Sequence, residues 1–262
     1  MIQNKKISLV IPCRNEAKSI ASLLKKIPRF IDEVIVVDNR STDDTYTIAK
    51  SYGARVLKEN RLDGFGIGYG YALRRGMAAA KGDIIVSLDG DGTYPVNQIG
   101  RAISFMIKKN LSLVIGNRFP INNQAISFLR QYGVWILNQE ASIFYGYEFK
   151  DILSGMWLIN RSLLRQLNLK QGGWNLSPEI KLACLQASRK GIGQFHIDHY
   201  YRDFGASKQK IWQTGVNHLV YIFLRWLTVD QPLTSLAQTW LSRINLRLAR
   251  ALVTYHSLRR EL

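Results

Sequence analysis

Short apolar runs alternate with helical patterns along the first half of the sequence, and this alternation leaves few folds open. Runs rich in β-branched residues at Ile7–Pro12, Val34–Asp38 and Asp83–Leu88 predict buried strands. Between the first two, apolar residues recur at helical spacing within Glu16–Ile27. Strands joined by helices pair in parallel through right-handed crossovers. The sequence therefore predicts an α/β fold with a mostly parallel sheet flanked by helices.

The same patterns continue, with less regularity after about residue 125. They predict strands at Ala54–Glu59, Leu111–Gly116 and Gly193–Tyr201, and helices at Ser41–Tyr52, Pro95–Lys109, Ala125–Tyr145 and Leu176–Arg189. In open α/β sheets, ligands bind at the carboxyl ends of the strands. The residues that follow each predicted strand are therefore the candidates for a functional site.

The charge of the chain limits its partners. There are 36 Lys and Arg residues against 19 Asp and Glu, a net charge of +17, which predicts nucleic acid, anionic lipid or a phosphorylated substrate. The two cysteines lie far apart and exclude a disulfide framework, as expected in a reducing compartment. The first apolar run is too short for a signal peptide, and no run reaches the roughly 20 apolar residues of a spanning helix. A cytoplasmic protein is expected.

The strongest chemical signal is Asp89-Gly90-Asp91, which follows a predicted buried strand. Two carboxylates one residue apart project to the same side of an extended backbone. Carboxylate and phosphate oxygens suit Mg²⁺ and Mn²⁺, and the glycine lets a diphosphate approach. The alternative interpretation is an acidic turn, but the position at a strand end favours metal binding.

Other strand ends carry polar residues too. Asp38 and Ser41 follow the second strand, where an acid commonly accepts hydrogen bonds from a ribose or base. The first strand ends in Pro12-Cys13-Arg14-Asn15-Glu16 and lacks Gly-x-Gly-x-x-Gly, which argues against a classical NAD or FAD domain. Four alternate glycines, Gly64 to Gly70, fit either close approach to a ligand or a flexible loop.

Taken in order, IPCRNEAKSI, VIVVDNRSTDDT, KGDIIVSLDGDGTYP and GNRF resemble the motifs of glycosyltransferase family 2, which has the GT-A fold. The branch most similar to the chain is that of dolichol-phosphate mannose and glucose synthases. The resemblance implies an inverting transfer of a hexose from a GDP- or UDP-linked sugar to a polyprenyl or dolichyl phosphate, with Mg²⁺ or Mn²⁺ as cofactor.

The family motifs assign roles to residues of this chain. On the donor side they imply that the nucleotide is held by Pro12, Asn15, Glu16, Asp38, Ser41, Asp89 and Gly90, with Asp89 and Asp91 on the metal and Arg118 of GNRF on a phosphate. On the acceptor side they imply Arg130, Ser154, Glu179 and Ser207, together with Arg202 and Lys208. Asp91, Arg118, Arg202 and Lys208 are the expected catalytic groups. Val134 stands where the family has a serine beside the arginine.

The segment Tyr201–Lys208 resembles the Arg-x-x-Gly-x-Ser-Lys signature of lipid-phosphate acceptors. Two cations, a hydroxyl and a glycine turn make a cradle for an anion. The runner-up function is a family 2 transferase with a hydroxyl acceptor, for which Glu179 is the candidate base. In a phosphate-accepting enzyme, Glu179 instead supplies a favourable charge at a helix N-terminus or helps with positioning. A nucleic-acid-binding protein and a non-catalytic adaptor leave the ordered acids unexplained.

The C-terminal segment is expected to differ from the rest. A catalytic domain over residues 1–210 would precede a helical tail over 211–262, with a clear amphipathic helix at Leu236–Tyr255. Residues 205–262 contain eight basic and two acidic residues. The tail is predicted to lie on an anionic membrane without spanning it, which makes the protein peripheral on the cytoplasmic face. Packing on the catalytic domain or on a second subunit, as in a homo-oligomer, is the alternative.

Overall fold

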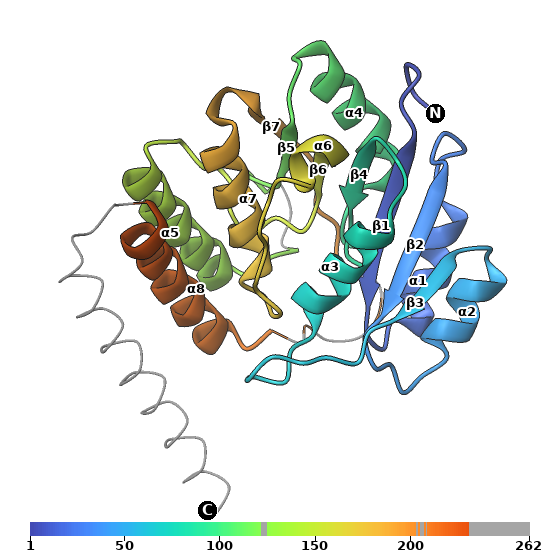
Figure 1. The fold of residues 1–262 in the computed structure, drawn as a ribbon. Helices are drawn as coiled ribbons and strands as arrows, with labels where there is room; N and C mark the ends of the chain where they lie inside the picture. The colour runs from blue at the N-terminus through green and yellow to red at the C-terminus, as the bar shows by residue number, and fades with distance from the viewer. Residues whose placement is uncertain (122–124, 203, 205–206, 208, 231–262) are drawn as a thin grey trace, which may run out of the picture. The chain divides into compact units, whose positions relative to one another are not determined.

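The computed structural model describes residues 1–121, 125–202, 204, 207 and 209–230 (Figure 1). By contacts the chain divides into two compact units, residues 1–219 and 220–262. The first unit holds the sheet and the predicted site. Lys208 and the predicted helix Leu236–Tyr255 lie outside the described residues, and the predicted division at residue 210 stays a prediction.

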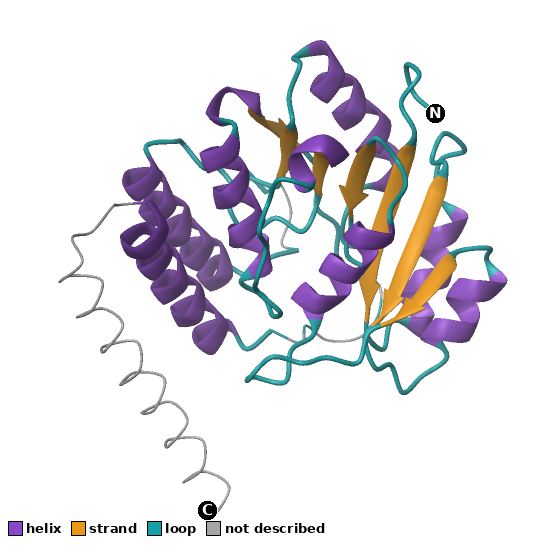
Figure 2. Cartoon of the chain, viewed as in Figure 1, coloured by secondary structure: helices purple, strands orange, loops and turns teal. Residues whose placement is uncertain are grey.

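A seven-stranded sheet in the order β3-β2-β1-β4-β6-β5-β7 forms the centre of the first unit (Figure 2). Its strands are β1 (Ile7–Cys13), β2 (Glu33–Asp38), β3 (Arg55–Lys58), β4 (Ile84–Ser87), β5 (Leu113–Asn117), β6 (Trp157–Asn160) and β7 (Ile192–His196). Only β6 runs antiparallel to its two neighbours, β4 and β5. The α/β fold with a mostly parallel sheet is confirmed.

Helices cover both faces of this sheet. The helices of the described residues are α1 (Ala17–Lys25), α2 (Thr45–Ser51), α3 (Tyr69–Ala79), α4 (Ile99–Lys108), α5 (Phe128–Tyr145), α6 (Arg161–Leu164), α7 (Leu176–Ala187) and α8 (Ile211–Arg225), with short 3₁₀ turns at Val96–Gln98 and Arg189–Gly191 and a π-helical segment at Trp226–Asp230. Alternate β1 residues Ile7, Leu9 and Ile11 pack with α1, α2 and α4 in one fully buried core. Because β1 is buried along its whole length, its carboxyl end is held rigidly where the site begins.

Several predicted elements are shorter in the structure than in the sequence pattern. The helix expected from Ser41 begins at Thr45, because Ser41 and Asp43 instead accept hydrogen bonds from the backbone N–H groups of Asn15 and Ala17. The strand expected over Gly193–Tyr201 ends at His196. Among the described residues, no helix combines the length and the apolar character needed to cross a membrane.

Candidate active site

The acidic motif lies at the carboxyl end of β4, beside the end of β1. β1 and β4 pair in parallel, so Asp89-Gly90-Asp91 and Pro12-Cys13 leave the sheet at the same edge. A Cβ added at Gly90 would lie 2.4 Å from the Sγ of Cys13, so glycine is what lets the two segments pack this closely. Both carboxylates line a pocket of about 480 Å³.

That pocket gathers most of the predicted site residues. Those lining it are Pro12, Glu16, Asp89, Gly90, Asp91, Arg118, Arg130, Arg202 and Ser207. Five predicted residues, Asn15, Asp38, Ser41, Ser154 and Glu179, do not line it. The structure therefore brings donor-side and acceptor-side candidates into one cavity and leaves the other five outside its lining.

Asp89 is half-buried and is held by the groups around it. The hydroxyl of Tyr69 donates a hydrogen bond to its Oδ1 at 3.1 Å, and the ring of Tyr69 packs against Trp174. A Cβ added at Gly155 would lie 2.6 Å from Asp89 Oδ2, so a bare backbone faces the carboxylate. Burial, reinforced by the charge of Asp91, raises the pKa of Asp89 to about 7. Two acids held this close make a site that a cation would stabilise.

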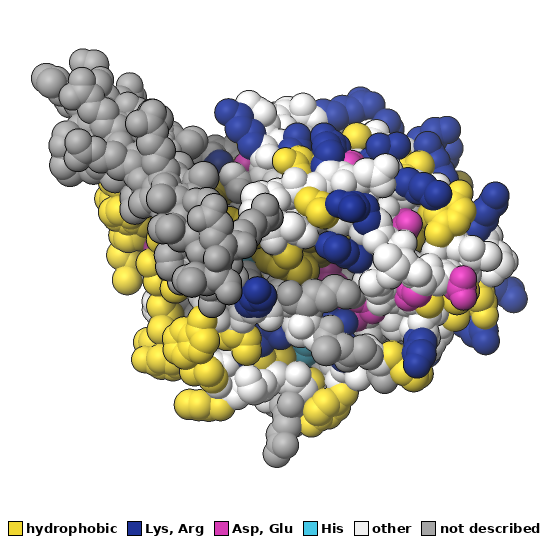
Figure 3. Space-filling model, turned by 90° about the horizontal axis from the view of Figure 1, so that it is seen from below, with side chains coloured by type: hydrophobic (Ala, Val, Ile, Leu, Met, Phe, Trp, Pro, Cys, Tyr) yellow, Lys and Arg dark blue, Asp and Glu magenta, His cyan; other side chains and the backbone are white. Residues whose placement is uncertain are grey.

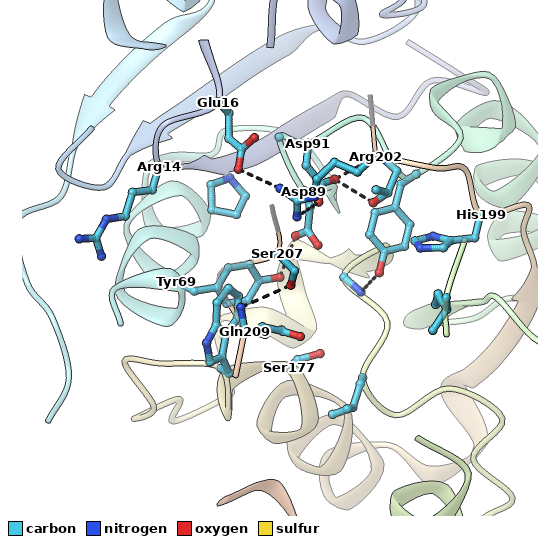
Figure 4. Close-up of a pocket in the computed structure, with 18 of the residues that line it drawn as sticks. Arg14, Glu16, Tyr69, Asp89, Asp91, Ser177, His199, Arg202, Ser207 and Gln209 are labelled. Atoms are coloured by element: carbon cyan, nitrogen blue, oxygen red, sulfur yellow. Dashed lines mark hydrogen bonds and ion pairs between the residues drawn. The ribbon is translucent and has the colours of Figure 1, made fainter. Parts of the chain in front are cut away.

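Arg202 is the cation that meets these acids (Figure 4). Its Nη2 lies 2.5 Å from Asp91 Oδ2, and its Nη1 lies 3.5 Å from Glu16 Oε1. The family resemblance implied a place for Arg202 beside the acceptor phosphate. In the structure its guanidinium lies against the donor-side acids, and its role toward an acceptor stays a prediction.

Arg118 is paired with a different acid. Its Nε and Nη2 bind the two oxygens of Asp151 at 2.6 and 2.8 Å, a bidentate pair in which Asp151 is fully buried. Burial alone would lower the pKa of Arg118, but the Asp151 carboxylate outweighs it and keeps the pKa above the ordinary value. Arg118 is thus a fixed positive charge in the wall of the pocket.

Asn15, Ser41 and Asp38 hold the pocket's donor-side loops together. Asn15 has a positive φ of 54°; its N–H donates to Ser41 Oγ, and its Oδ1 accepts from Thr42 N at 2.7 Å. The N–H of Ser41 donates to Asp38 Oδ1 at 3.1 Å. These hydrogen bonds tie the segment after β1 to the segment after β2. A direct contact of these three residues with a nucleotide stays a prediction.

The predicted acceptor-side residues share the pocket with apolar side chains. Arg130 donates a hydrogen bond to Gln209, and Ser207 lies beside Gln209, whose N–H donates to Ser207 Oγ at 3.4 Å. Ala125, Ile126, Val134 and Leu153 line the same region. Ser154 does not line it, because its buried hydroxyl donates to the carbonyl of Met156.

The carboxylate of Glu179 accepts hydrogen bonds from two backbone N–H groups. Its carboxylate accepts hydrogen bonds from Lys170 N and Gln171 N at 2.9–3.1 Å, and the residue is 2% exposed. A carboxylate held in this way anchors the segment before α7, and Glu179 does not line the pocket. Its role as a base toward a hydroxyl acceptor stays a prediction.

Sequence reasoning missed Lys181. This lysine is fully buried, and its Nζ donates to the carbonyls of Ile152 and Ser154, both at 2.7 Å, and to Ser177 Oγ. Burial lowers its pKa to about 7. It braces the turn that places Gly155 against Asp89. The sequence signal for it is a lysine flanked by the apolar residues Ile180 and Leu182 in α7.

The histidines were interpreted as structural, and two of them border the pocket. His199 packs edge-on to Tyr94, and His218 Nδ1 lies 2.7 Å from Asn175 Oδ1. Burial lowers the pKa of both, to about 4 and about 3, so both are neutral at pH 7. Among the described residues, no group of three or more His, Cys, Asp or Glu side chains is placed to hold a metal ion.

The carboxylates still suit a divalent cation that a diphosphate helps to hold. Mg²⁺ is usually bound by one or two carboxylates together with substrate phosphates. Asp89 and Asp91 supply such a pair, and burial beside Asp91, which raises the pKa of Asp89, makes this a carboxylate that a cation would stabilise. The donor set therefore fits a metal shared between Asp-Gly-Asp and a ligand diphosphate.

The fold and this site define an α/β protein with an acidic, arginine-lined pocket at the carboxyl edge of its sheet. A family model described as glycosyl transferase family 2 matches residues 8–167, and the chain belongs to this family. The glucosyl-3-phosphoglycerate synthase of Mycobacterium tuberculosis, solved with Mn²⁺, UDP-glucose and phosphoglyceric acid, superposes with a TM-score of 0.65 at 23% identity, covering 84% of this chain and 80% of that one. The GT-A fold is thereby confirmed.

Curated relatives include proteins named for lipid-phosphate substrates. An uncharacterized glycosyltransferase of M. tuberculosis, Rv0539, is 36% identical over 68% of this chain and 79% of its own. The dodecaprenyl-phosphate galacturonate synthase of Rhizobium johnstonii is 27% identical over 81% of this chain and 64% of its own. The dolichyl-phosphate hexose transferase of Haloferax volcanii is 29% identical over 75% and 83%. The match spans only 59% of glycosyltransferase AglJ of H. volcanii. The resemblance to polyprenyl-phosphate glycosyltransferases is confirmed.

Proposed function

We propose that the chain is an inverting glycosyltransferase that moves a hexose from a GDP- or UDP-linked sugar to a polyprenyl or dolichyl phosphate, with Mg²⁺ or Mn²⁺. The observation that carries the proposal is the composition of one pocket. Asp89 and Asp91 line it together with Arg130, Arg202 and the apolar side chains of Ile126, Val134 and Leu153. A nucleoside diphosphate with a metal fits the two acids, and a phosphate with an apolar tail fits the arginines and the apolar lining. The names of two relatives support the same acceptor class.

The proposed reaction is one in-line displacement. An oxygen of the acceptor phosphate attacks the anomeric carbon while the bond from that carbon to the donor's diphosphate oxygen breaks, and the nucleoside diphosphate leaves with the electron pair. The configuration at the anomeric carbon inverts. A phosphate monoester has a second pKa of about 6, so the acceptor is largely dianionic at pH 7 and needs no general base.

The chain's own residues would position the two anions and neutralise their charge. Arg118, fixed by Asp151, supplies a positive charge that does not move during the reaction. Arg130 and Arg202 reach the pocket from α5 and from the segment after β7, where an acceptor phosphate needs cations. The bound metal would add Lewis-acid stabilisation of the leaving diphosphate.

A hydroxyl acceptor is the second candidate, and the pocket gives it less support. Glu179, the base it requires, is buried under backbone donors. Among the described residues that line the pocket, the carboxylates are Glu16, Asp89 and Asp91, all on the donor side. Both reactions offer the arginines the charge of the donor diphosphate, but only a phosphate acceptor brings a second negative charge for them to neutralise.

Peripheral attachment to the cytoplasmic face of a membrane is part of the proposal. A polyprenyl phosphate is available only at a membrane surface, and a net charge of +17 favours a surface that carries anionic lipid.

The test compares three acceptors in detergent: a polyprenyl phosphate, the corresponding polyprenol and a free disaccharide. Each receives the same labelled nucleotide sugar and Mn²⁺. We expect label to enter the lipid phosphate alone. Transfer to the polyprenol or the disaccharide at equal or higher rate would establish a hydroxyl acceptor instead.

A further inference from the structure

Helix α5 carries a row of large apolar side chains on its outer side. Phe128, Leu129, Tyr132, Trp135, Ile136 and Ile143 form this apolar face, with Phe128 84%, Ile143 75% and Trp135 54% exposed. At about 100° per residue all six fall within about a third of the helix circumference, where the exposed Gln139 also lies. Single exposed hydrophobics are ordinary, but six on one side of a helix are not.

The charges of α5 lie at partly buried positions, and Glu140 stands at the margin of this face, one turn from both Ile136 and Ile143. The helix has two charged residues, Arg130 and Glu140, and both are partly buried. No exposed position between Phe128 and Tyr145 carries a charge. A helix that faced only water would present charged or polar groups there. The composition therefore indicates a surface that something apolar covers.

The start of α8 extends the row. Ile211, Trp212, Val216 and Leu219, all in the first compact unit, are also exposed. Arg130 of α5 binds Gln209, just before α8, and both residues line the pocket, which ties the two segments together. In Figure 3, hydrophobic side chains gather on the left of the view, the side on which α5 lies in Figure 1.

The inner side of the same helix belongs to the site. Arg130 and Val134 line the pocket, one turn apart, and Leu137 and Ala141 continue that side into the core. α5 is thus a wall between the pocket and the apolar face. Whatever covers the face lies one helix diameter, about 10 Å, from the place where an acceptor phosphate would bind.

We propose that the apolar face of α5 is the surface on which the chain rests on an anionic lipid bilayer. The inference deepens the proposed function and rests on it, because the bilayer is where a polyprenyl phosphate resides. Tyr132 and Trp135 stack at 5.7 Å, and these two residue types concentrate at membrane–water interfaces.

Charge selects a bilayer over a second copy of the chain. Lys210 precedes α8, and Arg189 donates to the carbonyls of Tyr145 and Gly146 at the C-terminal end of α5. These cations stand at the margins of the apolar row, as they do on helices that lie in the interface plane of anionic membranes. Two copies of a chain with a net charge of +17 would repel each other on close approach.

The direct test places a polarity-sensitive fluorophore on the face of the full chain. Both native cysteines, Cys13 and Cys184, are buried, so an introduced surface thiol is labelled selectively. Label at Ile143→Cys should shift to the blue with phosphatidylglycerol-containing vesicles, whereas label at Tyr52→Cys, on an exposed residue after α2, should not. No shift at residue 143 in vesicles that bind the protein would overturn the proposal.

A second measurement separates α5 from the tail. The full chain with Phe128→Ser and Trp135→Ser should bind these vesicles at least fivefold more weakly than the wild type, with its circular dichroism unchanged. Unchanged binding, together with loss in a Trp240→Ser, Leu241→Ser chain, would assign the membrane contact to the tail. A wild type that sediments as a dimer, and that the α5 substitutions convert to monomer, would assign the face to a second copy.

The outcome is independent of the reaction. Vesicle binding needs neither donor nor acceptor. Transfer to a short polyprenyl phosphate dissolved in detergent should stay within twofold of the wild type in the Phe128→Ser, Trp135→Ser chain. If the wild type shows no transfer to this acceptor in detergent, that result counts against the proposed function. The fluorophore result would still decide the membrane contact.

Discussion

The guanidinium of Arg202 pairs with both Glu16 and Asp91. If Asp91 holds the metal as proposed, Arg202 would compete with the divalent cation for its oxygens. We expect Arg202→Ala to bind Mn²⁺ about tenfold more tightly in the absence of substrates, a change of about 1.4 kcal/mol, and to use lipid phosphate poorly. Calorimetry with Mn²⁺ measures the first effect. Arg202→Lys keeps a cation and is the control; an unchanged or lower Mn²⁺ affinity in Arg202→Ala would refute the competition.

Asp91 is the acid through which this competition acts. Asp91→Asn should lower transfer at least 100-fold, because the amide binds a hard cation poorly, while the unfolding midpoint stays close to that of the wild type. Asp44→Asn, at an exposed acid before α2, is the matched control and should retain activity. Near-normal turnover by a folded Asp91→Asn protein would remove Asp91 from the metal site.

His218 should impose a pH dependence on stability. Its folded pKa, about 3, lies below the ordinary value of 6.5, chiefly because it is buried and further because Lys181 is nearby. Unfolding therefore binds a proton below pH 6.5, and stability is lost as the pH falls from 6.5 toward 3, by at most about 1.4 kcal/mol per pH unit. Urea unfolding of wild type and His218→Gln between pH 7.5 and 4.5 should show the shallower slope in the variant. Parallel slopes would contradict the assignment.

Among the connections between elements, the turn between α5 and β6 lies against the Asp89 carboxylate. The backbone of this turn is held by Lys181, and Gly155 within it touches Asp89. Gly155→Ala should push the Asp89 carboxylate out of place and lower transfer at least 100-fold. Gly133→Ala in α5, where an added Cβ meets nothing within 4 Å, should retain activity and gain about 0.5–1 kcal/mol of stability. Equal activity of the two variants would show that Gly155 has no role in placing Asp89.

Periodicity predicted every strand of the sheet except β6 and most of the long helices, and motif order named nine of the residues that line the pocket. They could not predict where Ser41 goes, because its hydrogen bond to Asn15 joins loops 26 residues apart and displaces the helix start. Glu179 looked available as a base, yet two backbone N–H groups from the preceding loop occupy it. Lys181 was missed because a buried lysine is recognisable only once its carbonyl partners are known. The sequence shows which groups are present, and tertiary contacts decide which of them are accessible.

For the whole molecule, the net charge of +17 should make membrane attachment sensitive to salt. Each basic residue near an anionic surface contributes about 1 kcal/mol at low ionic strength, and salt screens this attraction. Raising NaCl from 50 to 500 mM should lower binding to phosphatidylglycerol vesicles about tenfold or more, as measured by flotation. Binding that is insensitive to salt, or equal on neutral vesicles, would exclude an electrostatic contribution.

Transfer of a hexose to a lipid phosphate can be read directly from the mass of the lipid product. Purified chain is incubated with GDP- and UDP-linked hexoses, polyprenyl phosphate and either Mg²⁺ or Mn²⁺, and the lipid phase is analysed by mass spectrometry. We predict a polyprenyl phosphate heavier by one hexose for at least one donor, lost on chelation of the metal and absent with Asp91→Asn. A product that forms equally with Asp91→Asn, or no hexosyl lipid from any donor of the panel while a hydroxyl acceptor is glycosylated, would contradict the account.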